Sequence, residues 1–200
     1  MAVRRLHQEL LREDLKTFER QSKGQIYLIY ALDASGSMRG KKIDVCKKAG
    51  VALAFNALRK HDKVGLIVFG SDIKTSIPPT DNFTLLLKEI TTIKAAKETN
   101  IAKTIQRATE LFPSADVTKH LILLTDALPT TGENPQQETL EMVSLAKSMG
   151  ITVSLIGIQL DEKGKRLAEK IAELGEGRLY VVRDLENLDK IVLEDYYSLI

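Results

Sequence analysis

The stretch QIYLIYALDASGSM, residues 25–38, joins an apolar run to a cluster of oxygen-bearing side chains. Residues 25–32 are rich in Ile, Leu and Tyr and show no polar alternation, which is typical of a strand buried on both faces of a parallel sheet. Asp33, Ser35 and Ser37 then follow at intervals of two. The stretch therefore predicts a buried strand that ends at a loop carrying one carboxylate and two hydroxyls.

Four further segments have the same apolar pattern, and amphipathic helical patterns separate them. The expected buried strands are residues 63–69, 120–125, 151–158 and 178–182. Helices are expected at about residues 40–60, 101–112, 135–149, 161–174 and 185–196. Residues 73–77 follow the 63–69 strand too closely for a parallel crossover, so we expect them to form an antiparallel edge strand. The sequence predicts an α/β fold: a doubly wound, mostly parallel six-stranded sheet with one antiparallel edge strand and helices on both faces.

Composition bounds the class of protein. The chain has 200 residues, 44% hydrophobic and 28% charged, which suits one globular domain. We expect that domain to occupy residues 24–200, after a charged helical lead-in at residues 1–23. The net charge of +2 gives no reason to expect a nucleic-acid or membrane surface. The single cysteine excludes an internal disulfide, and the N-terminal segment is too charged for a signal peptide, so we expect a cytoplasmic protein.

A second group of oxygen-bearing residues is expected to meet the first at one edge of the sheet. Asp126 ends the 120–125 strand, and Thr99 opens the helix that leads into that strand. In doubly wound sheets, ligands gather beyond the carboxyl ends of the strands, where the strand order reverses. Both groups meet there if the 25–32 and 120–125 strands are neighbours. The candidate metal ligands are then Asp33, Ser35, Ser37, Thr99 and Asp126. Because all five offer hard oxygen atoms, they favour Mg²⁺, Mn²⁺ or Ca²⁺ over zinc or copper.

Simpler roles compete at each position. Ser35, Ser37 and Thr99 could each be helix caps, and the two aspartates could be turn residues at strand ends. As an alternative function, a phosphate-ester or nucleotide hydrolase could use the Asp33 loop with Mg²⁺. However, residues 35–42 lack the first glycine and the Ser/Thr of a phosphate-binding P-loop. Ser35 also stands where an aspartyl-phosphate phosphatase needs its general acid. We therefore expect a binding module without enzymatic activity.

The helix after the candidate loop is expected to bury one stripe and to expose its lysines. The expected buried stripe is Ile43, Cys46, Gly50, Leu53 and Ala57. The expected solvated residues are Lys41, Lys42, Lys47 and Lys48. We therefore interpret Cys46 as a packing residue rather than a reactive thiol.

The oxygen-bearing motif resembles that of the von Willebrand factor type A (VWA) domain. The shared features are Asp-x-Ser-x-Ser after the first strand, a Thr opening a later helix and Thr-Asp after a further core strand, and the resemblance covers about residues 24–198. It implies a metal-ion-dependent adhesion site with Asp33, Ser35, Ser37 and Thr99 as ligands, and with Asp126 usually acting through water. This chain has Lys97-Glu98 where the family often has glycines, and Ala127 where a glycine often follows the second Asp.

The resemblance also implies how such a site is used. A partner protein's Asp or Glu side chain completes the metal shell, and ligand capture moves the last helix, here about residues 184–198. For that reason we expect Leu185, Leu188 and Val192 to pack in a groove loose enough for the helix to slide. Similar intracellular members, such as magnesium-chelatase-like proteins, tend to be subunits of larger complexes that include an AAA+ ATPase. We therefore expect an adaptor or a subunit of such a complex.

Overall fold

The computed structural model describes residues 24–93, 99–126 and 128–199, so the expected lead-in at residues 1–23 lies outside the described residues. The strands are β1 (Ile26–Asp33), β2 (Lys63–Phe69), β3 (Ile73–Thr80), β4 (Thr118–Thr125), β5 (Ile151–Ile158) and β6 (Glu176–Val182). The α-helices are α1 (Lys41–Arg59), α2 (Phe83–Thr92), α3 (Ile101–Leu111), α4 (Pro135–Ser148), α5 (Glu162–Leu174) and α6 (Leu188–Tyr197). Two 3₁₀ helices are η2 (Gly36–Met38) and η3 (Leu185–Asn187).

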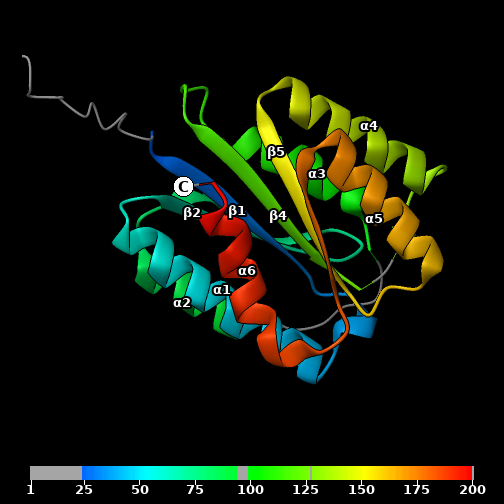
Figure 1. Ribbon diagram of the computed structural model, residues 1–200, viewed down its shortest axis with the longest axis horizontal. Coiled ribbons are helices and arrows are strands. Elements are labelled where there is room, and N and C mark those ends of the chain that lie inside the picture. Colours follow the sequence, from blue (N-terminus) through cyan, green and yellow to red (C-terminus); the bar gives the residue numbers. More distant parts are fainter. Residues whose placement is uncertain (1–23, 94–98, 127, 200) are drawn as a thin grey trace, which may run out of the picture.

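The strands form one six-stranded sheet in the order β3-β2-β1-β4-β5-β6. All neighbouring pairs are parallel except β2 and β3, which are antiparallel. Figure 1 shows α1, α2 and α6 on one face of the sheet and α3, α4 and α5 on the other. The predicted fold class is thereby confirmed. Because β2 and β4 flank β1, the strand order reverses at β1, and the carboxyl ends of β1 and β4 form the switch point.

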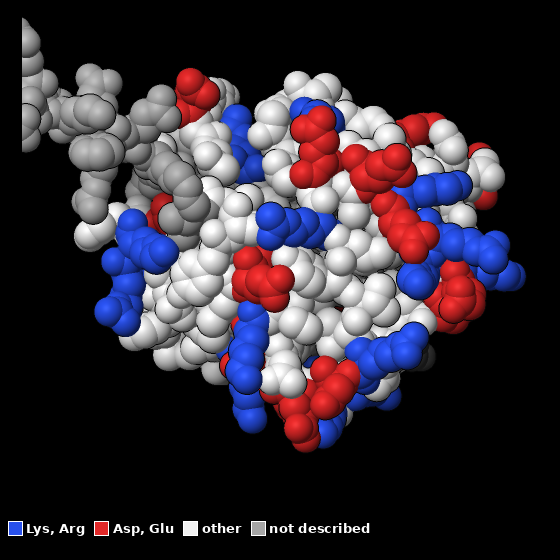
Figure 2. Space-filling view, viewed as in Figure 1, with Lys and Arg blue, Asp and Glu red and all other residues white. Residues whose placement is uncertain are grey.

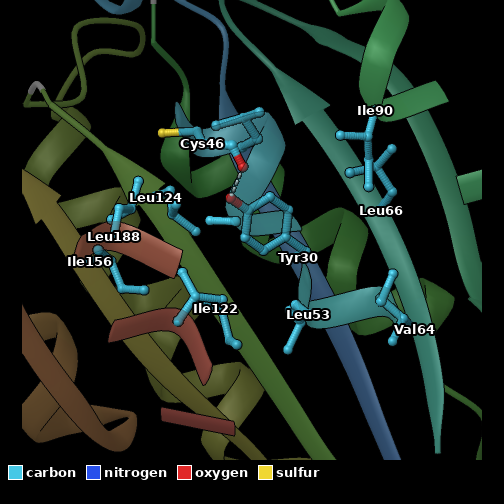
Figure 3. Close-up of a cluster of buried hydrophobic side chains, with 14 of the residues drawn as sticks. Tyr30, Cys46, Leu53, Val64, Leu66, Ile90, Ile122, Leu124, Ile156 and Leu188 are labelled. Carbon is cyan, nitrogen blue, oxygen red and sulfur yellow. Dashed lines mark hydrogen bonds between the residues drawn. The ribbon is translucent and has the colours of Figure 1, made fainter. Parts of the chain in front are cut away.

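Close packing holds α1 against β1. The Tyr30 hydroxyl of β1 donates a hydrogen bond to the Cys46 carbonyl oxygen of α1 at 2.6 Å (Figure 3). Gly50 permits this approach, because a Cβ atom there would lie 2.8 Å from the Tyr30 ring. The stripe expected from the sequence is buried: Ile43, Cys46, Gly50, Leu53 and Ala57. The loop between β1 and α1 is therefore held at both ends by the core.

The edge strand and the segment after it differ from the expectation. β3 continues to Thr80 instead of ending at residue 77. Pro78 and Pro79 are tolerated there because they lie on an edge strand, at the point where its register with β2 shifts between the pairs Leu66–Ile77 and Val64–Thr80. β2 lies close to this strand at Gly65, where a Cβ atom would be 2.7 Å from the Ile77 carbonyl oxygen. The α2 helix follows directly, although the sequence patterns did not predict a helix there.

Helix α6 is held to the sheet by buried polar contacts. The Asp195 carboxylate lies 2.7 Å from His120 Nε2 of β4 and accepts a hydrogen bond from Ser154 Oγ of β5 at 2.8 Å. The next residue is Tyr196, whose hydroxyl donates a hydrogen bond to the Asp62 carboxylate at 2.6 Å. Asp195 and Tyr196 are both fully buried. These contacts argue against the loose groove that the sequence led us to expect under this helix.

The surface carries a mixture of both signs of charge. On the face drawn in Figure 2, basic and acidic residues alternate, in agreement with the small net charge of +2. Among the residues described by the structure, no helix is long and apolar enough to cross a membrane.

Candidate metal centre

Asp33 is the deepest member of the candidate site. It is the last residue of β1, and its side chain is fully buried. Its Oδ1 accepts a hydrogen bond from the Ser35 backbone N–H at 2.7 Å, which turns the chain tightly after the strand. Its Oδ2 accepts hydrogen bonds from Thr125 Oγ1 at 2.6 Å and from Thr99 Oγ1 at 3.5 Å. The carboxylate therefore joins β1, β4 and the segment that precedes α3.

Burial of Asp33 has an electrostatic consequence. Desolvation raises the pKa of its carboxyl group, and the charge of Asp126 adds to that increase, while hydrogen bonds from Thr125 and Ser35 oppose it. A raised pKa means that the protein environment disfavours the ionised carboxylate. A cation placed against this group would reduce that cost, because it would compensate the buried negative charge.

The two serines connect Asp33 to the second carboxylate. Ser35 Oγ lies 3.1 Å from Ser37 Oγ, and Ser37 Oγ donates a hydrogen bond to Asp126 Oδ1 at 2.7 Å. Asp126 follows β4, which is the parallel neighbour of β1. The structure thus brings the five oxygen-bearing residues expected from the sequence into one connected group. The condition set by the sequence, that the two strands be neighbours, is met.

The helix-cap interpretation fails where the structure tests it. The N-cap of α3 is Asn100, whose side chain accepts a hydrogen bond from the Lys103 N–H at 2.9 Å, so the Thr99 hydroxyl is not the cap. Ser35 precedes η2 without a side-chain capping bond, and the N-cap of α1 is Gly40. These hydroxyls are therefore available for another role. The turn interpretation does apply to Asp33, since it bonds the backbone N–H two residues ahead.

Two further residues of the site, Thr125 of the Thr-Asp pair and Lys42, had no role assigned to them from the sequence. Thr125 donates a hydrogen bond to Asp33, as described above. The expectation that Lys42 is solvated is wrong: its Nζ lies 2.6 Å from Asp126 Oδ2, and the exposed fractions of the two side chains are 24% and 1%. A signal was present, because Lys42 stands four residues before Cys46 and so lies on the buried stripe of α1.

The donor set fits a hard divalent cation. Among the described residues, no group of three or more His, Cys, Asp or Glu side chains could hold a metal ion. The candidate residues would offer a metal two carboxylates and three hydroxyls, with oxygens from water or a partner completing the shell. The Lys42 ammonium already lies against this group, which shows that the group accepts positive charge. Glu98 and Ala127, where the sequence departs from the family pattern, lie outside the described residues.

Comparisons with known sequences identify the family of this chain. The sequence model of the von Willebrand factor type A domain matches residues 28–129. Inter-alpha-trypsin inhibitor heavy chain H4 of Bos taurus is 28% identical over 185 residues, which cover 86% of this chain and 20% of that protein. The magnesium-chelatase 67 kDa subunit of Heliobacterium mobile is 27% identical over 182 residues, which cover 84% of this chain and 27% of that protein. The chain thus spans only a minor part of the length of either relative.

Solved structures share the fold. The pilus adhesin SpaC of Lactobacillus rhamnosus GG has a TM-score of 0.75 at 14% identity, covering 90% of this chain and 30% of that one. Proximal thread matrix protein 1 from the mussel byssus has a TM-score of 0.69 at 21% identity, covering 86% of this chain and 47% of that one. Its structure was solved with zinc in the metal-ion-dependent adhesion site (MIDAS) motif. Since the family model matches half of the chain, within the same fold, this protein belongs to the von Willebrand factor type A domain family.

Proposed function

We propose that this chain is a metal-dependent protein-interaction module. A divalent cation binds at the candidate ligands Asp33, Ser35, Ser37, Thr99 and Asp126, and an acidic side chain of a partner protein binds to that cation. The observation that carries the proposal is the convergence of two carboxylates and three hydroxyls at the switch point of the sheet. The hard oxygen donors favour Mg²⁺, with Mn²⁺ or Ca²⁺ as alternatives.

Each residue has a distinct part in this proposal. Asp33 supplies a full negative charge from a fixed position, because three hydrogen bonds orient it at the end of β1. Ser35, Ser37 and Thr99 supply neutral oxygens, and Asp126 acts through water, as the family resemblance implies. Ser37 is exposed, so the site is open to solvent on one side. A bound ion would supply a Lewis-acidic positive charge at this opening.

The chemistry of the site selects the partner. Two carboxylates and three hydroxyls leave room in the shell of a six-coordinate ion, and an anionic oxygen satisfies it best. We therefore propose a partner Asp or Glu side chain as the remaining ligand. The relationship to a magnesium-chelatase subunit supports a role as an adaptor or subunit of a larger complex, for which we propose an AAA+ ATPase as the associated protein. A cytoplasmic location stays a prediction, and cell fractionation tests it.

A hydrolase remains the alternative, and the geometry of Asp33 speaks against it. A nucleophilic carboxylate must present a free oxygen to the substrate. Asp33 is fully buried, so its carboxylate is not exposed to a phosphate ester approaching from solvent. Ser35, two residues on, carries no carboxyl group that could protonate a leaving group. We therefore propose binding without turnover.

The test compares thermal stability with and without Mg²⁺ or Mn²⁺. Binding to the folded state alone at ten times Kd stabilises by about 1.4 kcal/mol, which raises the melting temperature by roughly 2–4 °C. Asp33→Ala should lose this shift, Ser35→Ala and Thr99→Ala should reduce it least, and Asp126→Ala should fall between. Asp81→Ala is the matched control, because it removes an exposed carboxylate from the end of the β3 edge. A wild-type protein without any shift would contradict the proposal.

The second part of the test concerns the partner. The wild-type protein and the Asp33→Ala variant are used as bait in Mg²⁺ and in chelator. A partner recovered by the wild type in Mg²⁺ should be absent in chelator and absent with the variant. Recovery that is equal under all of these conditions would show that the interaction does not pass through a metal at Asp33.

A further inference from the structure

Lys42 occupies an unusual position for a lysine. It belongs to the first turn of α1, directly after the candidate loop, and its ammonium group lies against the Asp126 carboxylate. The Nζ–Oδ2 distance is 2.6 Å, while Asp126 Oδ1 accepts the hydrogen bond from Ser37 at 2.7 Å. Both oxygens of Asp126 are therefore engaged by residues of this chain.

The contact with Lys42 compensates a buried charge. The Asp126 side chain is 1% exposed, and a carboxylate at such a depth is unfavourable unless a cation or several hydrogen-bond donors face it. A divalent cation among the candidate ligands would perform the same compensation. The Lys42 ammonium and the metal ion are thus alternative counter-ions for one carboxylate.

We propose that Lys42 is an internal counter-ion that stabilises the metal-free site and competes with the divalent cation for Asp126. This inference rests on the proposed metal site and adds a regulation to it. Two carboxylates balance a divalent ion, so the Lys42 ammonium leaves one positive charge in excess when the ion is present. That excess weakens binding of the ion alone and favours the addition of an anionic ligand. By linkage, a partner carboxylate then strengthens metal binding as much as the metal strengthens binding of the partner.

If Lys42 and the metal compete for Asp126, removing the lysine charge should lower the stability of the metal-free protein and raise its affinity for the metal. Lys42→Gln removes the charge but keeps an N–H donor for Asp126. Without metal, the variant should melt about 2–4 °C lower, because a buried carboxylate loses its counter-ion. Its affinity for Mn²⁺ should be about tenfold higher or more, because two cations a few ångströms apart repel each other strongly at a partly buried site. If Lys42 served only to stabilise the fold, Lys42→Gln would lower the melting temperature without raising the affinity for Mn²⁺.

The experiment measures Mn²⁺ binding by calorimetry, with Mn²⁺ as the sole ligand, together with melting of the metal-free proteins. Lys42→Arg keeps the charge and should bind Mn²⁺ like the wild type. Lys48→Gln is the matched control, since it removes one exposed charge from the same helix, and it should change neither quantity. Asp33→Ala should not bind Mn²⁺ in this assay.

The outcomes separate this inference from the proposed function. If the wild type and Lys42→Gln bind Mn²⁺ equally well and Asp33→Ala does not, the metal site stands and the role of Lys42 is refuted. Weaker binding by Lys42→Gln refutes it as well. If neither the wild type nor Lys42→Gln binds Mn²⁺, the proposed function fails and this inference fails with it. The competition is supported if Lys42→Gln binds Mn²⁺ more tightly than the wild type, Lys42→Arg and Lys48→Gln do, and if it is less stable than they are without metal.

Discussion

The buried contacts of Asp195 predict a large effect of one substitution on stability. Asp195→Ala leaves His120 Nε2 and Ser154 Oγ without their carboxylate partner inside the core. Each buried polar group that loses its partner costs about 1–3 kcal/mol, and breaking a buried pair by removing one member typically costs about 3–5 kcal/mol. We therefore expect a loss of about 3–5 kcal/mol, which lowers the melting temperature by roughly 6–20 °C for a domain of this size.

Equilibrium unfolding in urea measures this change directly. The matched control is Glu194→Ala, because Glu194 is the preceding residue of α6 and is exposed. The control should change the free energy of unfolding by no more than about 0.5 kcal/mol. A loss below about 1 kcal/mol for Asp195→Ala would contradict this expectation, since the buried contacts of Asp195 would then contribute little to holding α6. It would also restore the sliding helix that the sequence led us to expect.

Three further predictions concern single side chains. Burial, followed by the charges of Asp126 and Asp33, raises the pKa of the Cys46 thiol to about 12. An alkylating reagent at about pH 8 should therefore modify Cys46 only after unfolding, and rapid modification of the native protein would contradict its burial. Burial raises the pKa of the Tyr30 and Tyr196 hydroxyls, so their contribution to stability is complete below about pH 10 and is lost as the pH rises further. Absorbance at alkaline pH should show these two tyrosines ionising only when the protein unfolds, and their ionisation in the folded state would disprove this. Asn100→Ala should cost about 0.5–2 kcal/mol in urea unfolding, because it removes the side-chain cap of α3, and an unchanged stability would show that the cap is dispensable.

The fold could be predicted because its signals are local. Apolar runs without alternation predicted the buried strands, and the helical stripe of α1 was recognised from its spacing. Helix α2 was missed because exposed leucines obscure its buried stripe: Leu86 and Ile90 are buried one turn apart, but Leu85 and Leu87 beside them are 37% exposed. A local signal did exist at Asn82, whose side chain caps the helix by accepting a hydrogen bond from the Leu85 N–H. The last three residues of β3 were also missed, because they include Pro78 and Pro79 and prolines usually argue against a strand.

The candidate site could be assembled from the sequence because all of its residues except Thr99 lie at or just after strand ends, whose relative positions the fold class determines. The partners of those residues were harder to find. The spacing of Lys42 from Cys46 placed it on the buried stripe of α1, but it did not indicate that the ammonium reaches Asp126. Likewise, His120 and Asp195 are 75 residues apart in the chain, and no local pattern connects them. Long-range polar contacts of this kind depend on packing details that periodicity does not encode.

The proposed function depends on a divalent cation that binds among Asp33, Ser35, Ser37, Thr99 and Asp126. Anomalous diffraction from crystals grown with Mn²⁺ tests it most directly, because the signal locates the metal without assumptions about its ligands. We expect one strong peak in contact with the hydroxyl oxygens of Ser35 and Ser37, and no peak at this position in crystals of Asp33→Ala. A peak only at other carboxylates, or the same peak in both proteins, would contradict it.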